Sequence, residues 1–153
     1  MTTRATLCYI VKDEKILLIN KKRGFGAGKW NGPGGKICAG ESPAAAAARE
    51  TEEETGLRPK NIKDAGILEF YFGQKEIPDM TVHIFIADDF SGSMTESEEA
   101  TPGWFSVSDI PFSKMWPDDK IWMPLMLQGK RVNGAFYFDE SMDKIMDYVV
   151  KEA

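Results

Sequence analysis

Residues 35–57 read GKICAGESPAAAAARETEEETGL and contain the clearest helix pattern of the chain. Ser42 is suited to cap the N-terminus of a helix, and Pro43 fits its first position because that residue needs no backbone N–H donor. Five alanines and a charged run follow, and Gly56 is suited to end the helix. The pattern therefore predicts a helix that begins at Pro43 and ends just before Gly56.

The predicted helix carries four glutamates, at position 50 and at positions 52–54. Glu50 and Glu54 are four residues apart on one face, where two like charges destabilise a helix by roughly a few tenths of a kcal/mol. Arg49 is placed to reach Glu53, but neither Glu50 nor Glu54 has a basic residue at the matching position of the helix. The pattern fits either a solvated acidic face or a site for a hard divalent cation, which takes carboxylate oxygens and shares its shell with water and phosphates.

The flanking residues favour the cation site. Gly35, five residues, Glu41, seven residues and then Arg49-Glu50-Thr51-Glu52-Glu53-Glu54-Thr55-Gly56-Leu57 resemble the signature of the Nudix hydrolase family at all its charged and glycine positions. Thr51 departs from the bulky aliphatic residue that the family favours. The resemblance implies an α+β domain with the Nudix fold, an α/β/α sandwich around a mixed, curved sheet. It also implies hydrolysis of a nucleoside diphosphate linked to another group.

The resemblance assigns roles to the helix residues. It implies that Glu50, Glu53 and Glu54 bind Mg²⁺, or Mn²⁺ in its place, with the carbonyl of Gly35 as a further ligand. A glutamate orients or deprotonates the attacking water, and Arg49 fixes a glutamate in place. A cation is also needed on physical grounds, because the phosphates of a nucleotide and the glutamates are all negative. Two unit charges of the same sign a few ångströms apart repel by about 1 to 4 kcal/mol.

One acidic residue outside the helix has a possible role at this site. Glu99 matches by position a further loop carboxylate of the Nudix family, which would make it part of the catalytic and metal-binding set. By itself, Glu99 reads equally well as a solvated loop charge.

A narrower resemblance lies outside the helix, in residues 21–32 (KKRGFGAGKWNG) and 111–119 (PFSKMWPDD). These segments are similar to the Nudix hydrolases that remove oxidised purine nucleoside triphosphates, such as 8-oxo-dGTP and 2-hydroxy-dATP, from the nucleotide pool. The similarity runs through nearly the whole chain. It implies a base pocket formed by Thr6, Lys21, Phe25, Asn31, Phe70, Phe72, Trp116, Asp118 and Asp119.

The chemistry of these residues suits a purine. Trp116 offers a flat stacking surface, and Asn31 offers a donor and an acceptor. Two adjacent carboxyls at one base edge do not both ionise easily, so we expect one of Asp118 and Asp119 to keep a proton and donate it. Taken singly, the aromatic residues also fit a core, and Trp-Pro-Asp-Asp fits an ordinary helix start. Their occurrence together with the glycine-rich segment favours the pocket.

The rest of the chain predicts one domain, residues 1–153, with several strands. Residues 3–11 and 15–21 predict a hairpin around a turn at 12–14, and further strands are expected at 65–72, 81–87, 104–107 and 136–138. The glycine-rich residues 24–35 predict a loop without regular strands. Apolar residues at helical spacing after Ser141 predict a C-terminal helix with a core-facing stripe of Met142, Ile145, Met146, Val149 and Val150.

Composition narrows the partners and the location. The 153 residues carry a net charge of −5, which argues against a nucleic-acid polymer as partner. Cys8 and Cys38 have no metal-ligand spacing and are read as free thiols of a reducing compartment. The N-terminal residues resemble neither a leader nor a membrane span, so we expect a cytoplasmic protein. The expected partner is a small nucleoside triphosphate, and no membrane partner is expected. We expect the protein to act as a monomer or a dimer. We interpret His83 as a structural residue.

Two kinds of alternative stay open. The first is a Nudix hydrolase of another nucleotide, such as a dinucleotide polyphosphate, a nucleotide sugar or a methylated purine triphosphate. The second is a non-catalytic nucleotide-binding regulator, and the intact Arg49, Glu50, Glu53 and Glu54 argue against it.

Overall fold

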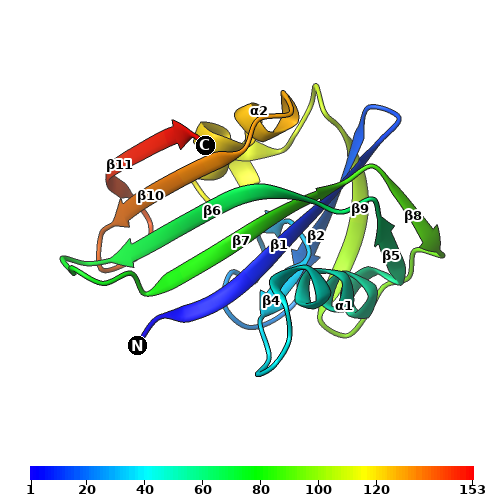
Figure 1. The fold of residues 1–153 in the computed structure, drawn as a ribbon, viewed down its shortest axis with the longest axis horizontal. Coiled ribbons are helices and arrows are strands. Elements are labelled where there is room, and N and C mark those ends of the chain that lie inside the picture. The colour runs from blue at the N-terminus through cyan, green and yellow to red at the C-terminus, as the bar shows by residue number, and fades with distance from the viewer.

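A computed structural model describes residues 1–153 and builds them around one large mixed sheet (Figure 1). Two α-helices and one short 3₁₀ helix at Phe112–Lys114 accompany the strands. The elements are β1 (Thr3–Lys12), β2 (Lys15–Lys21), β3 (Trp30–Asn31), β4 (Gly34–Lys36), α1 (Pro43–Thr55), β5 (Leu57–Lys60), β6 (Lys63–Phe72), β7 (Met80–Ala87), β8 (Asp89–Gly92), β9 (Ala100–Ser106), α2 (Asp119–Leu127), β10 (Val132–Phe138) and β11 (Ile145–Glu152).

The large sheet has nine strands, in the order β11-β10-β6-β7-β1-β2-β3, with β4 beside β1 and β9 beside β2. The pairs β1–β7 and β6–β10 are parallel, and the other pairs are antiparallel. One edge of β1 pairs with β4 at residues 5–7 and with β2 at residues 11–12. Along this edge, β1 therefore changes its pairing partner from β4 to β2. The change brings β1, β2, β3 and β4 together around the glycine-rich segment.

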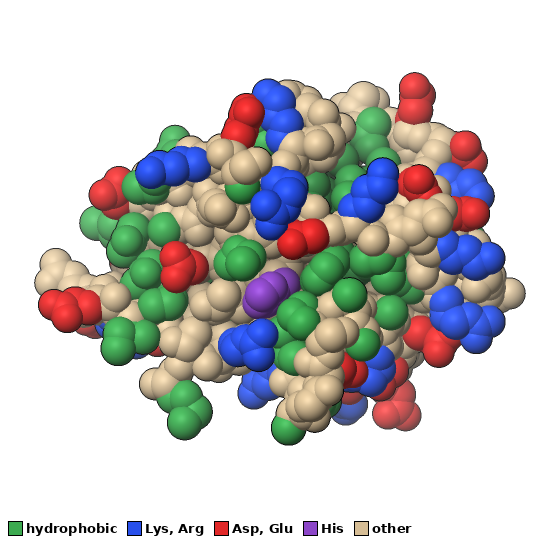
Figure 2. Space-filling model, viewed as in Figure 1, with side chains coloured by type: hydrophobic (Ala, Val, Ile, Leu, Met, Phe, Trp, Pro, Cys, Tyr) green, Lys and Arg blue, Asp and Glu red, His purple; other side chains and the backbone are tan.

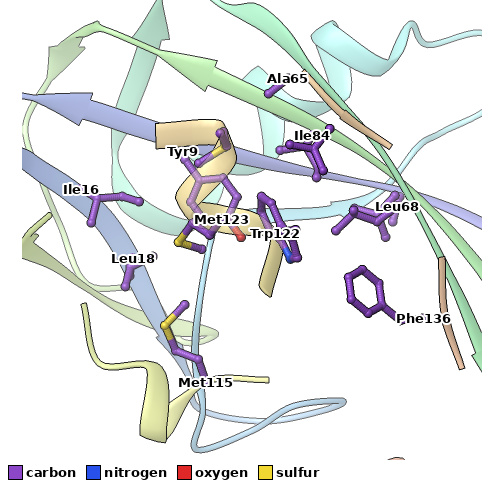
Figure 3. Packing of buried hydrophobic residues seen from close by; sticks show 14 of the residues in the cluster. Tyr9, Ile16, Leu18, Ala65, Leu68, Ile84, Met115, Trp122, Met123 and Phe136 are labelled. Carbon is purple, nitrogen blue, oxygen red and sulfur yellow. The ribbon is translucent and has the colours of Figure 1, made fainter. Parts of the chain in front are cut away.

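The two helices cover opposite faces of the sheet. Ile84 and Phe85 are neighbours on β7, so their side chains point to opposite faces. Ile84 belongs to the main core, which Trp122 and Met123 of α2 complete (Figure 3). Phe85, in contrast, packs with Ala47 of α1. This three-layer arrangement confirms the expected α+β fold, an α/β/α sandwich with a mixed sheet.

Helix α1 begins and ends where its sequence predicts. The Ser42 hydroxyl accepts a hydrogen bond from the Ala45 N–H at 3.2 Å, and Gly56 ends the helix with a φ of 79°. Thr51 is fully buried, and its hydroxyl donates to the Ala47 carbonyl at 2.7 Å. A smaller residue is accommodated at this position because its polar atom is satisfied within the helix.

Part of the sheet face that α1 leaves uncovered is visible in Figure 2, with His83 near its centre. Burial lowers the pKa of His83, and the nearby charge of Arg4 adds to this effect. His83 alternates with Val82 and Ile84 on β7, so it points away from the main core. Its structural role stays a prediction.

The C-terminal helix predicted after Ser141 is wrong. Residues Ile145–Glu152 form the edge strand β11, which is antiparallel to β10 along its length. Met142 has a φ of 64°, which is incompatible with a regular helix there. Helical spacing of apolar residues misled the prediction because Ile145 and Val150 also contact the core from a strand. The second helix is α2, which was not predicted as an element.

The expectation of a strandless glycine-rich segment is also wrong in part. Trp30–Asn31 and Gly34–Lys36 form the short strands β3 and β4. A Cβ atom on Gly34 would lie 1.9 Å from the Thr6 carbonyl oxygen, so the two backbones approach closer than any side chain allows. Glycine is needed here for strand packing.

The predicted hairpin and the other four strands are confirmed, with boundaries that differ by a few residues. Neither helix is long and apolar enough to cross a membrane.

Candidate active site

The deepest acidic residue of α1 is Glu54, of which only 4% is exposed. Its Oε1 accepts a hydrogen bond from the Gly34 N–H at 2.8 Å, across the corner between α1 and β4. Burial raises the pKa of Glu54 to about 7, and the negative charges of Glu50 and Glu99 add to this effect. The charged form of Glu54 is therefore costly until a positive charge joins it.

Glu50 lies one helical turn before Glu54, against the glycine-rich segment. A Cβ atom on Gly35 would lie 2.6 Å from the Glu50 carboxyl carbon, so a larger residue here would push the carboxylate out of its observed place. Burial raises the pKa of Glu50. Arg49 lowers this pKa in part, whereas the charges of Glu53 and Glu99 raise it further. Close packing therefore brings the Glu50 carboxylate to the backbone of Gly35.

Arg49 organises the acidic residues around it. Its guanidinium lies 2.7 Å from Glu41, 2.8 Å from Glu50 and 3.4 Å from Glu53. Bonding to Arg49 lowers the pKa of Glu41 to about 2. The expectation that Glu50 lacks a partner on its own helix is wrong, because the long, forked side chain of Arg49 bends onto the neighbouring residue.

The acidic residues fit a divalent cation only in part. No group of three acidic, histidine or cysteine side chains is arranged as a ready cage. Glu50 and Glu54 supply hard oxygens beside Gly35, which suits an ion that keeps water and phosphate in its shell. The side chains of Glu53 and Glu99 are 57% and 58% exposed and lie 3.4 Å from Arg49 and 3.9 Å from Arg23. Their roles as ligands stay predictions.

A cavity of about 150 Å³, open to solvent, lies next to these carboxylates. The cavity is lined by Gly35 and Glu54 together with all nine residues predicted for the base pocket, which are Thr6, Lys21, Phe25, Asn31, Phe70, Phe72, Trp116, Asp118 and Asp119. Glu54 thus connects the acidic corner, which is formed by Glu50, Glu53 and Glu54 of α1, with the predicted base pocket. Arg49, Glu50, Glu53 and Glu99 lie outside the lining.

Aromatic rings form much of the cavity wall. Phe25 and Trp116 are stacked with ring centroids 5.1 Å apart, and the Lys29 ammonium lies 5.2 Å from the Trp116 ring. Phe25 is 51% exposed, so this pair lies at the open side of the cavity.

Sequence reasoning missed several lining residues, among them Met80, Val82 and Phe138. Alternation along β7 and β10 places these side chains on the same face as Phe70 and Phe72. The sequence shows the alternation of apolar residues along β7 and β10, but it does not show that both strands pair with β6.

The two aspartates occupy different environments although both are almost fully buried. The Trp122 indole N–H donates to Asp118 Oδ2 at 2.9 Å, whereas Asp119 Oδ2 has no hydrogen-bond partner within the protein. Burial raises the pKa of both groups, and the charge of Asp118 raises that of Asp119 further. The arrangement favours a charged Asp118 that accepts and a protonated Asp119 that donates.

A family model described as "NUDIX domain" matches residues 1–126. The chain is 48% identical over 148 residues to a Danio rerio protein named "Oxidized purine nucleoside triphosphate hydrolase", covering 96% of this chain and 93% of that one. A Mus musculus protein of the same name is 46% identical with the same coverage. Among solved structures, a MutT protein from Bacillus halodurans superposes with a TM-score of 0.86 at 28% identity, covering 97% of both chains.

Proposed function

Because the chain belongs to the Nudix hydrolase family, we propose that it hydrolyses oxidised purine nucleoside triphosphates to the monophosphate and pyrophosphate. The leading substrates are 8-oxo-dGTP and 2-hydroxy-dATP, and their hydrolysis would remove oxidised purines from the nucleotide pool. The observation that carries this proposal is the buried Asp118–Asp119 pair in the cavity that Glu54 also lines. One carboxyl pair is suited to read a base, and the acidic corner is suited to the phosphates.

The base-reading part of the mechanism follows from the proton states of the pair. A protonated Asp119 donates to an acceptor on the purine edge, while Asp118, held by Trp122, accepts from a donor. Moving the single proton between the two carboxyls exchanges these roles. The same pocket is thereby suited to an oxo or an amino group at the edge of an oxidised purine.

The phosphate part of the mechanism needs a divalent metal, as Nudix hydrolases generally do, and we propose Mg²⁺, with Mn²⁺ as a substitute. Glu50, Glu53 and Glu54 would hold it, with Glu99 and the Gly35 carbonyl as further ligands. A bound cation would neutralise phosphate charge and would activate water. Arg49 holds Glu41 and Glu50 in position, and a glutamate of this group receives the proton of the attacking water.

Pyrophosphate release from a panel of nucleotides tests the proposal. With Mg²⁺ present, kcat/KM should be highest for 8-oxo-dGTP or 2-hydroxy-dATP and lower for dGTP and dATP, and chelation should abolish turnover of all four. A preference for a dinucleotide polyphosphate, a nucleotide sugar or a methylated purine triphosphate would replace the proposed substrate. Binding without hydrolysis of any nucleotide would indicate a regulator.

We propose that the reaction takes place in a reducing compartment. Both cysteines are free, Cys8 buried and Cys38 exposed, which fits a reducing compartment such as the cytoplasm.

A further inference from the structure

Tyr9 lies directly behind the pocket residue Asn31. It is fully buried in β1, and its ring meets the Trp122 ring edge-on with centroids 5.8 Å apart (Figure 3). A Cβ atom on Gly32 would lie 2.6 Å from two ring carbons of Tyr9. The Tyr9 ring is therefore a support on which the Asn31–Gly32 peptide rests, and it does not itself line the cavity.

The hydroxyl of Tyr9 points at the Asn31 amide. The Tyr9 oxygen lies 3.5 Å from Asn31 Oδ1, which also accepts a hydrogen bond from the Gly32 N–H at 2.8 Å. Burial and the charges of Asp119 and Asp118 raise the pKa of Tyr9, so its hydroxyl keeps the proton that it donates.

These contacts determine which way the amide faces. The Gly32 N–H can only donate, so the amide atom that it reaches must be the oxygen, and the Tyr9 hydroxyl then donates to the same oxygen. The NH₂ group of Asn31 is left for the cavity, which Asn31 lines. Asn31 then offers donors only, and it matches an oxo group or a ring nitrogen rather than an amino group.

We propose that Tyr9 is a positioning residue for base recognition, which acts by fixing the Asn31 amide with its NH₂ group toward the purine. The inference rests on the proposed function, because it assigns Asn31 to the base. It adds that Tyr9, which touches no substrate, helps to select purines that present an acceptor at this point.

A double-mutant cycle between Tyr9→Phe and Asn31→Ala tests the proposal. Tyr9→Phe keeps the ring beneath Gly32 and removes only the hydroxyl. Since one long, neutral hydrogen bond of 3.5 Å is at stake, we expect kcat/KM for 8-oxo-dGTP to fall about two- to fourfold, through KM, with kcat little changed. In the Asn31→Ala background the same change should cost less than about 1.3-fold.

Tyr71→Phe is the matched control. Tyr71 is a nearly buried strand tyrosine that stacks on Tyr137 and does not line the cavity, so kcat/KM should stay unchanged. An equal loss from Tyr9→Phe in both backgrounds would show that Tyr9 acts independently of Asn31 and would overturn the proposal. No loss in either background would do the same.

A measurement without substrate separates this inference from the proposed function. The side-chain NH₂ signals of Asn31, assigned in ¹⁵N-labelled protein as the pair that Asn31→Ala removes, should shift in Tyr9→Phe and stay in place in Tyr71→Phe. Unchanged signals in Tyr9→Phe would overturn the positioning role. If the wild-type enzyme prefers another purine nucleotide, the proposed substrate fails, while the cycle run on that nucleotide still tests Tyr9.

Discussion

The acidic corner of α1 and the aspartate pair of α2 use the same chemical group in opposite ways. In both places burial is the largest cause of a raised carboxyl pKa. Glu54 accepts a backbone N–H and Glu50 accepts from Arg49, so hydrogen-bond donors support their charged forms. Asp119 has an oxygen with no donor in the protein. The first arrangement prepares carboxylates for a cation, and the second keeps an acid that can donate.

The comparison implies that the two regions fail differently when a carboxyl is replaced by its amide. Loss at the acidic corner should stop the reaction for every nucleotide, because phosphates are common to all of them. Loss at the aspartate pair should change which base is accepted.

The largest effect is expected for Glu54→Gln and Glu53→Gln. Each should lower kcat by at least roughly 10³-fold on all substrates and leave the fold intact, as the loss of a metal ligand or base does. Steady-state kinetics with Mg²⁺ and circular dichroism measure the two properties. Glu52→Gln is the matched control, because Glu52 lies on the same helix and pairs with Arg58 at 3.2 Å. Near-normal rates in both test variants would remove the site assignment.

Asp119→Asn should have the next largest effect, confined to base selection. Losing a buried partner of a recognised group costs between about tens and several thousands of fold, so kcat/KM for the preferred oxidised purine should fall steeply. Poor substrates such as dGTP should change little. Asp109→Asn, at an exposed turn, is the control. A uniform loss on all substrates would assign the pair to folding or catalysis and would erase the contrast with the acidic corner.

The same two regions show what a sequence reveals. The acidic corner was predictable because its parts are local: Ser42, Pro43 and Gly56 mark the helix, and the glutamate spacing lies within it. The ion pair between Arg49 and Glu50 was not predictable from the sequence, because it depends on the side-chain conformation that Arg49 adopts in the packed structure.

The pocket was predicted through resemblance rather than from spacing. Its residues come from β1, β2, β3, β6, the start of α2 and the loops that hold Phe25 and Trp116, and only the tertiary fold brings them together. Tyr9 shows this limit best, since nothing in its sequence neighbourhood indicates contact with Asn31. The C-terminal strand was mistaken for a helix because pairing with β10 decided its structure against its local pattern.

A third prediction compares stability at the acidic corner with and without charge. The folded-state pKa of Glu54, about 7, lies above its ordinary value of 4.5, so the folded protein binds this proton more tightly than the unfolded chain. The carboxylate therefore destabilises the metal-free protein increasingly as pH rises from about 4.5 to about 7, by at most about 3 kcal/mol.

Glu54→Gln should remove this destabilisation. In the presence of chelator, its free energy of unfolding should exceed that of wild type at pH 8 and match it closely near pH 4.5. Denaturant titration at both pH values measures the difference, with Glu52→Gln as a control that shows none. A gain of equal size at both pH values would mean that charge is not its cause.

A smaller effect than that of Asp119→Asn is expected for Trp116→Ala, which tests whether the pocket separates stacking from base reading. The ring stacks on Phe25, lies 5.2 Å from the Lys29 ammonium and lines the cavity at its open side. Stacking contributes about 1 to 3 kcal/mol per base and depends little on which base is stacked. We therefore expect kcat/KM to fall about ten- to a hundredfold for 8-oxo-dGTP, 2-hydroxy-dATP and dGTP alike, with Trp116→Phe recovering much of the loss. The ratio of kcat/KM between 8-oxo-dGTP and dGTP should then stay within about threefold of wild type. If this ratio collapses as in Asp119→Asn, Trp116 positions the aspartates, and stacking and base reading are one function of the pocket.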